Sequence, residues 1–127
     1  MTKRKIVKRD AAAHRQLGLW TKRVEEAVWR ARVTCRAHGF ALAVHGSLRR
    51  DVDVIAVPWT PDATLSPRRL AKLVLDDLME AKLATGWTSG EPDGEGKPHG
   101  RRGFGIVLKG DPFLYMDISI LPPRKLR

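Results

Sequence analysis

The feature that most constrains this chain is the stretch FALAVHGSLRRDVDVIAV at residues 40–57. Apolar and β-branched residues lie on both sides of the Gly46-Ser47 dipeptide, and this pattern predicts two short strands joined by a loop. We expect the strands over residues 40–45 and 52–57. The Gly-Ser turn between them offers backbone N–H groups and a hydroxyl, which are the groups that bind a phosphate chain.

Two aspartates, Asp51 and Asp53, lie two positions apart at the second strand and project from the same face. Further along, this face becomes apolar, so we expect the two carboxylates at the rim of a core-facing surface. Carboxylates on one face repel each other unless a cation or a basic ligand lies between them. The pair therefore indicates a metal and phosphate site, with two exposed aspartates near a turn as the plainer interpretation.

A third carboxylate, Asp117, lies in YMDISI, which also reads as a strand. A lone acid inside an apolar strand is costly unless it is paired or bound to a metal. If this strand lies beside the strand of Asp51 and Asp53, the three carboxylates converge and would hold one or two divalent cations.

The rest of the chain predicts two helices and two more strands. An apolar stripe predicts a helix from Asp10 to about residue 38, although Gly18 weakens its first part, so that it is one helix, two helices or a helix that starts later. The Ser66-Pro67 pair predicts the start of another helix that runs to about residue 84 and is closed by Gly86. A glycine-rich loop should follow over 86–103, and then a hairpin of strands at 104–108 and 114–121.

This order, α-β-β-α-β-β, predicts a single α+β domain whose mixed or mostly antiparallel sheet carries helices on one face. A length of 127 residues fits one domain. We expect a basic N-terminal arm over 1–9, the domain over 10–121 and a basic C-terminal tail over 122–127.

The charge balance is strongly basic, with 24 Lys and Arg against 14 Asp and Glu and a net charge of +10. Such an excess favours a polyanionic partner, which is a nucleic acid, nucleotide phosphates or an anionic surface. The segment KPHGRR, at residues 97–102, is the densest basic cluster within the domain.

The single cysteine, Cys35, excludes an intrachain disulfide, and its place in an apolar stripe predicts a buried thiol. No apolar run approaches the roughly 18 residues of a membrane span, and no signal peptide is recognisable. We therefore expect a cytoplasmic protein without a membrane partner.

Taken together, Gly46-Ser47, the paired acids Asp51 and Asp53, and the later Asp117 resemble the DNA polymerase β-like nucleotidyltransferases, particularly the minimal members of bacteria and phages. That family has a strand, a Gly-Ser turn that opens a phosphate-binding loop, a strand with two alternating acids, and a third acid on a later strand. The resemblance covers roughly residues 40–121, but only about fifteen positions are specific.

The chain departs from the family pattern between the turn and the acids, where only Leu48, Arg49 and Arg50 intervene. Three residues leave no room for a helix N-terminus that points at phosphate. The missing positive charge could come from six basic side chains, which are Arg49, Arg50, Lys97, His99, Arg101 and Arg102.

The resemblance implies transfer of a nucleotidyl group from a nucleoside triphosphate to an acceptor such as RNA or protein, with RNA favoured by the charge. Asp51 and Asp53 would hold the Mg²⁺ or Mn²⁺ that carries the triphosphate. Asp117 would help to hold a second cation or accept the acceptor's proton. Gly46 and Ser47 would contact a terminal phosphate, and the basic residues would neutralise the leaving pyrophosphate.

Three alternatives to an active enzyme stay open, and one of them, a phage-type inhibitor that acts by protein contact, leaves no signature in the sequence. The site is either active or a degenerate one that binds phosphates without transferring them. Alternatively, the protein is a non-catalytic, basic nucleic-acid-binding module whose acids pair with arginines. The sequence also leaves open whether His45 orients an acid or only packs, and whether Trp59 stacks on a base or only packs.

Overall fold

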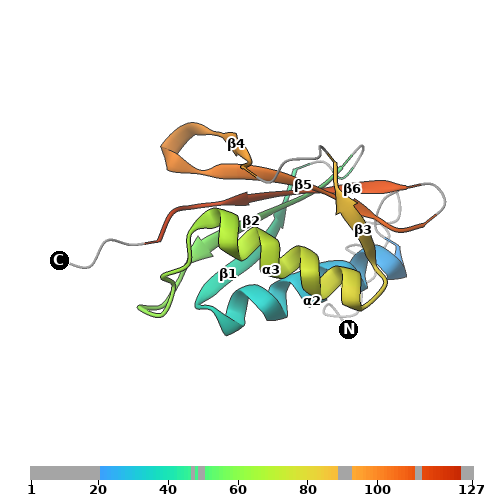
Figure 1. The fold of residues 1–127 in the computed structure, drawn as a ribbon, viewed down its shortest axis with the longest axis horizontal. Coiled ribbons are helices and arrows are strands. Elements are labelled where there is room, and N and C mark those ends of the chain that lie inside the picture. Colours follow the sequence, from blue (N-terminus) through green and yellow to red (C-terminus); the bar gives the residue numbers. More distant parts are fainter. Residues whose placement is uncertain (1–20, 47, 49–50, 89–92, 111–112, 124–127) are drawn as a thin grey trace, which may run out of the picture.

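The computed structural model of the chain describes residues 21–46, 48, 51–88, 93–110 and 113–123 (Figure 1). Several expected features lie outside these residues, namely the basic arm, the N-cap Asp10, the side chains of Ser47, Arg49 and Arg50, and the end of the tail. The described elements are α2 (Lys22–Ala37), β1 (Phe40–His45), β2 (Val52–Pro58), α3 (Pro67–Glu80), β3 (Ala84–Trp87), β4 (Glu95–Gly96), the 3₁₀ turn η1 (Pro98–Gly100), β5 (Arg102–Leu108) and β6 (Leu114–Ile120).

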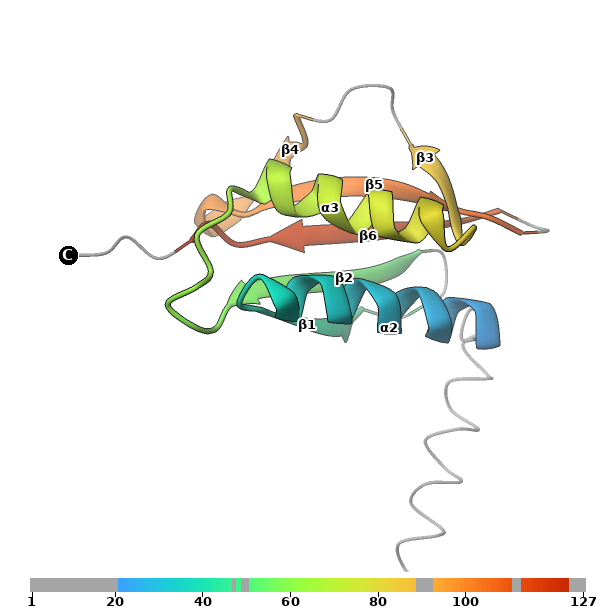
Figure 2. The same ribbon diagram turned by 60° about the horizontal axis from the view of Figure 1, so that its bottom comes forward.

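The strands form one mixed sheet in the order β1-β2-β6-β5-β3, and the two-residue β4 also pairs with β5. β2 and β6 are parallel, whereas the other pairs are antiparallel. Figure 2 shows α2 and α3 side by side over one face of this sheet. The expected α+β domain with a mostly antiparallel sheet and helices on one face is therefore confirmed, as is the antiparallel pairing of β5 with β6.

The helix α2 begins at Lys22, directly after an N-cap residue. Thr21 is the N-cap, and its hydroxyl accepts a hydrogen bond from the N–H of Val24 at 3.2 Å. Val24, Val28 and Cys35 lie on the buried stripe that was expected, and they pack into the core.

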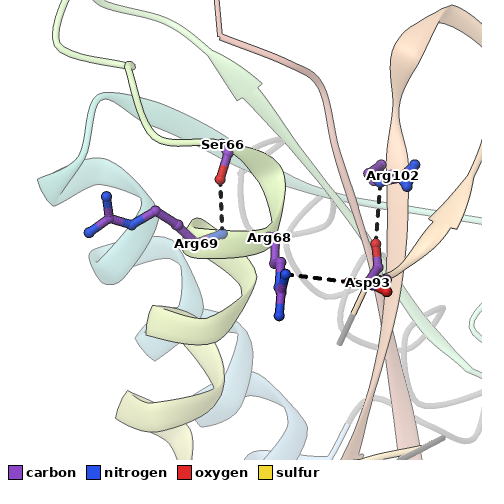
Figure 3. A network of polar contacts seen from close by, with 5 residues as sticks. All are labelled: Ser66, Arg68, Arg69, Asp93 and Arg102. Atoms are coloured by element: carbon purple, nitrogen blue, oxygen red, sulfur yellow. Dashed lines mark hydrogen bonds and ion pairs between the residues drawn. The ribbon is translucent and has the colours of Figure 1, made fainter. Parts of the chain in front are cut away.

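The helix α3 starts as predicted and ends earlier than predicted. Ser66 caps it by accepting the N–H of Arg69 at 3.3 Å (Figure 3). It ends at Glu80 rather than near residue 84, because Lys82 adopts a left-handed φ of 60° and the N–H of Leu83 bonds back to the carbonyl of Leu78 at 2.8 Å. This pattern is a Schellman motif with lysine where glycine is usual, so no helix stop signal can be recognised at this point of the sequence.

The prediction of a loop over 86–103 is wrong in part. It contains the end of β3, the short β4 and the turn η1. β3 pairs with β5 through an irregular register between Ala84 and Gly86. A four-residue strand that contains a glycine and a bulge has too little alternation to be recognised from sequence.

The core lies between the helices and one face of the sheet. On the two central strands the core-facing side chains are 0% exposed, and they are Val52, Val54, Ala56, Met116, Ile118 and Ile120. Side chains alternate along a strand, so Asp53 and Asp117 project from the helix-free face. The expectation that the acids lie at the rim of a core-facing surface is therefore wrong, because the apolar residues beyond them on that face are only half-buried.

The thiol of Cys35 is buried in this core, as predicted, and burial raises its pKa to about 12. A thiol with such a pKa is protonated at neutral pH and is a poor nucleophile. In the described part of the chain, no helix has the length and apolar character needed to cross a membrane.

The turn from α2 into β1 depends on Gly39. Its φ is +83°, and its carbonyl accepts the N–H groups of Trp59 and Thr60 at 2.9 and 3.1 Å. A Cβ at this position would lie 2.6 Å from the hydroxyl oxygen of Thr60 and 2.7 Å from the backbone nitrogen of Ala63. Both the conformation and the close approach require glycine here.

We expect Gly39→Ala to lower the free energy of unfolding by at least about 2 kcal/mol, because left-handed backbone strain adds to a clash with backbone that cannot move freely. Urea denaturation followed by circular dichroism measures this loss. Gly96→Ala is the matched control, since its Cβ would have only the guanidinium of Arg102 nearby, at 3.9 Å. Equal, small effects of the two substitutions would contradict this account of the turn.

Candidate functional site

Asp53 and Asp117 face each other across the middle of the sheet. β2 and β6 are parallel neighbours, and the register pairs Asp53 directly with Asp117. Adjacent strands are roughly 5 Å apart, and both side chains project from the helix-free face. Asp51 lies two residues before Asp53, just ahead of β2. The topology thus places the three predicted acids at one place on the sheet.

The electrostatics of Asp53 reflect this placement. Burial raises the pKa of the Asp53 carboxyl, the Asp117 carboxylate raises it further, and Asp51 adds to the rise. His45, which pairs with Asp53 across β1 and β2, and Lys97 act in the opposite direction and lower it. His45 therefore lies within electrostatic reach of the acids, although its side chain is exposed.

Gly46 leaves room for the Asp53 carboxylate. A Cβ on Gly46 would lie 2.7 Å from Oδ2 of Asp53, and the φ of Gly46 is +81°. Two residues on, Leu48 adopts a φ of 56°, which strains a leucine, yet its side chain is buried in the core. The burial of Leu48 offsets this strain and anchors the connection beside the acids.

The strand β5 presents two glycines beside Asp117. Gly105 pairs with Asp117 in the register of β5 and β6, and Gly103 lies on the same face. A Cβ on Gly103 would lie 3.6 Å from Oδ1 of Asp117 and 2.6 Å from Cε of Lys97. A Cβ on Gly105 would clash with the side chain of Thr88. Lys97 and Thr88 therefore occupy the space that side chains at positions 103 and 105 of β5 would otherwise fill.

A cavity of about 540 Å³ opens over these glycines. Its size is in the range of small-molecule binding sites. Residues from β3 to β6 and from the segments between them line it, together with the aspartate just before β2, and most of them are acidic, aromatic or small. They are Asp51, Trp87, Thr88, Asp93, Gly94, Glu95, Gly103, Phe104, Gly105, Tyr115, Met116 and Asp117. Asp51 and Asp117 thus share one hollow with the glycine-lined strand, whereas Asp53 does not line it.

One wall of this cavity is tied to the helix layer through Asp93 (Figure 3). The Asp93 carboxylate lies 3.4 Å from the guanidinium of Arg68 on α3, and its backbone carbonyl accepts a hydrogen bond from Nε of Arg102 at 3.2 Å. Next to it, Gly94 has a φ of +76°, and a Cβ there would lie 2.6 Å from the ring of Phe104. These contacts hold the segment before β4 against β5.

The basic residues predicted from KPHGRR do not all reach the acids. Lys97 lies over Gly103 and acts on Asp53. Arg102 shares the strand face of the core residues, so its side chain leaves β5 on the side away from Asp117. Nε of Arg101 donates to the carbonyl of Pro98 at 3.2 Å, and His99 is exposed.

The acids have the donor chemistry of a magnesium or manganese site, because hard divalent cations prefer carboxylate oxygens. Among the described residues, none of the carboxylates of Asp51, Asp53 and Asp117 accepts a hydrogen bond or forms an ion pair within 4.0 Å. Over the same residues, no group of three or more His, Cys, Asp or Glu side chains is arranged to hold a metal ion. Coordination by all three acids would require their side chains to turn toward one another.

Sequence reasoning missed the cavity residues Thr88, Gly103, Gly105 and Tyr115. A signal for the two glycines was present, because alternating glycines inside a strand often mark the close approach of a ligand or another segment. Tyr115 carried no signal of its own, since its exposure depends on the packing of β5 and β6.

A scan against protein-family models and a search of curated proteins found no match to this chain. The chemistry of the site therefore rests on its own residues. Two facing carboxylates, with a third nearby and a lysine beside them, suit a cation that carries a phosphate ester.

We expect Asp53→Asn to raise the stability of the metal-free protein at pH 7. The pKa of Asp53 is raised in the folded state, so the folded protein favours the protonated carboxyl, and stability falls as the pH rises through this pKa. The isosteric amide removes that penalty. The gain should be a few tenths of a kcal/mol, since the pair is partly exposed, and it should shrink toward acidic pH.

Urea denaturation at pH 7 and at lower pH values, without divalent cations, measures this difference. Asp76→Asn is the control, because that exposed carboxylate pairs with Lys72 at 2.7 Å on α3 and its loss should slightly destabilise. A clear loss of stability in Asp53→Asn at pH 7 would contradict the repulsion between Asp53 and Asp117.

Proposed function

We propose that this protein is a minimal, metal-dependent nucleotidyltransferase that transfers a nucleotidyl group from a nucleoside triphosphate to an acceptor hydroxyl of RNA or protein. The observation that carries the proposal is the direct pairing of Asp53 with Asp117 on adjacent parallel strands. Asp51 at the same end of β2 and the adjoining cavity support it.

The three acids have distinct roles in this proposal. Asp51 and Asp53 would hold the Mg²⁺ or Mn²⁺ that accompanies the triphosphate, and Asp117 would share a second cation or accept a proton. The bound cation would neutralise charge on the phosphate oxygens in the transition state. Gly46, which has no Cβ, leaves room for Oδ2 of Asp53 beside the backbone of the Gly-Ser turn.

The reaction is a displacement at the α-phosphorus of the nucleotide. The acceptor hydroxyl oxygen forms a bond to phosphorus, the bond from phosphorus to the bridging oxygen of the β-phosphate breaks, and pyrophosphate leaves with that electron pair. The hydroxyl proton passes to the carboxylate of Asp117 or to water. Lys97, beside both Asp117 and the cavity floor, would neutralise charge on the phosphates.

The nucleoside would occupy the cavity over β5. The glycines at 103 and 105 allow a flat group to lie close to the strand backbone. Tyr115, which is 49% exposed and lines the cavity, offers an aromatic face for a base.

The alternative function is a non-catalytic nucleic-acid-binding module. The exposed turn around His99, with Lys97 before it and Arg101 and Arg102 after it, favours this alternative because it presents positive charge on the surface. In that case the acids would be structural, and nucleic-acid binding would depend on the turn rather than on Asp53.

Isothermal titration calorimetry of ATP, GTP, CTP and UTP, with and without Mn²⁺, tests the proposal. We expect at least one nucleotide to bind in a metal-dependent manner and Asp53→Asn to weaken that binding by about tenfold or more, because the variant removes a charged cation ligand. Asp76→Asn should bind like the wild type. A bound nucleotide then identifies the label to follow in assays of transfer to RNA and protein.

Metal-dependent binding that is equal in wild type and Asp53→Asn would contradict the assigned site. The alternative instead predicts no metal-dependent nucleotide binding, and nucleic-acid binding that survives Asp53→Asn but weakens in the double variant Arg101→Gln, Arg102→Gln.

A further inference from the structure

A second hollow lies on the border of the molecule formed by β1 and α2. Figure 2 shows these two elements together along one side, opposite the side that carries β3 and β4. The hollow has a volume of about 220 Å³. Its lining residues are Arg32, Arg36, Gly39, Phe40, Ala41, Leu42, Trp59 and Thr60, and we call it the Trp59 groove.

The indole of Trp59 is presented to solvent on a fixed backbone. Trp59 is 72% exposed, although tryptophan is usually largely covered in a folded protein. The backbone N–H groups of Trp59 and Thr60 both donate to the carbonyl of Gly39, so the backbone that carries the indole is held in place. An aromatic face fixed at the surface beside a groove is suited to stacking.

The charge in the Trp59 groove is positive. Arg32 and Arg36 project into it from α2, and none of its lining residues is acidic. Within the described part of the chain, neither arginine forms an ion pair with a carboxylate. Two arginines beside an exposed indole are complementary to a partner that has both phosphates and flat bases.

The groove is less suited to a partner β-strand. β1 is an edge strand, and such edges attract other strands. Here, however, Nε of Arg32 donates to the carbonyl of Leu42, in the middle of β1, at 3.3 Å. An added strand would have to displace this guanidinium before it could pair along the edge.

We infer that the Trp59 groove binds a single-stranded segment of nucleic acid, with a base stacked on Trp59 and the flanking phosphates next to Arg32 and Arg36. A single strand is required, because the indole can stack only on a base that is not already stacked within a duplex. The net charge of +10 favours the same class of partner.

This binding surface does not depend on the proposed catalysis. Trp59 follows β2 at the end opposite Asp53, six residues further along the chain, which corresponds to about 20 Å. If the protein is a nucleotidyltransferase, a single-stranded nucleic acid that is bound in the groove and runs along β1 would be a source of the acceptor hydroxyl. If it is not, the groove is still a nucleic-acid site.

Fluorescence anisotropy of labelled oligo(U) and oligo(dT) 12-mers with the full chain tests this inference at 50 and 200 mM salt. Because Trp59→Ala removes the stacking of one base, we expect it to raise Kd about tenfold, and Trp59→Phe should recover most of the lost affinity. Arg36→Gln should raise Kd severalfold and make binding less salt-dependent by about one phosphate contact.

Two matched controls separate the groove from general basic attraction. Phe113→Ala removes another exposed aromatic side chain, and Arg69→Gln removes an exposed arginine on α3, and neither residue lines the groove. We expect both to bind almost like the wild type. Circular dichroism of each variant verifies that it is folded.

The inference is overturned if the wild type binds neither oligonucleotide, or if Trp59→Ala and Phe113→Ala change Kd equally. It is also overturned if Trp59→Ala leaves Kd unchanged, and in that case a loss of self-association in light scattering would assign the groove to a second copy of the chain. Asp53→Asn should leave oligonucleotide binding intact, so a failure of the catalytic proposal remains distinguishable.

Discussion

The parallel pairing of β2 with β6 is the constraint on which the rest of this structure depends. Parallel neighbours cannot be joined by a hairpin, so a long connection separates β2 from β6, and this connection contains α3 as well as β3, β4 and β5. The helices then cover one face of the sheet. The same pairing puts Asp53 opposite Asp117 on the other face, where two like charges meet in the middle of the sheet.

The cost of that pairing is limited by where it occurs. The helix-free face leaves Asp53 and Asp117 half-buried, and His45 and Lys97 offset part of their repulsion. Around the acids the chain uses further unfavourable local choices, such as the left-handed backbone of Leu48. Local strain and like charges that the surrounding fold holds in place are common where a protein binds or transforms a ligand.

Much of this arrangement could be predicted from local sequence. The alternation in DVDVIAV predicted that Asp53 lies on the face opposite Val52 and Val54, and Ser66-Pro67 predicted the start of α3, because strand alternation and helix capping depend on neighbouring residues. The end of α3 could not be read, since a lysine at position 82 takes the place that glycine usually holds.

The long-range features could not be predicted. Which face of β2 the helices cover depends on the summed apolar area of residues far apart in the chain. Ile55 and Val57 share the face of Asp53, and their apolar character wrongly indicated that this face packs against the core. The orientation of Arg102 depends on where β5 begins. The strand starts at Arg102, two residues before the start that was predicted from the sequence, so strand alternation decides the face of this side chain. The Trp59 groove likewise exists only because α2 packs along β1 and places Arg32 and Arg36 next to a residue from the end of β2.

The central claim is that Asp53, with Asp51 and Asp117 beside it, forms a cation site for a nucleotide. Anomalous diffraction at the manganese edge, from crystals grown with Mn²⁺ and a non-hydrolysable nucleoside triphosphate, tests it most directly. We expect an anomalous peak within about 2.5 Å of carboxylate oxygens from Asp53 and from at least one of Asp51 and Asp117, with the nucleotide extending over Gly103 and Gly105. A map without a peak at these carboxylates would contradict the claim.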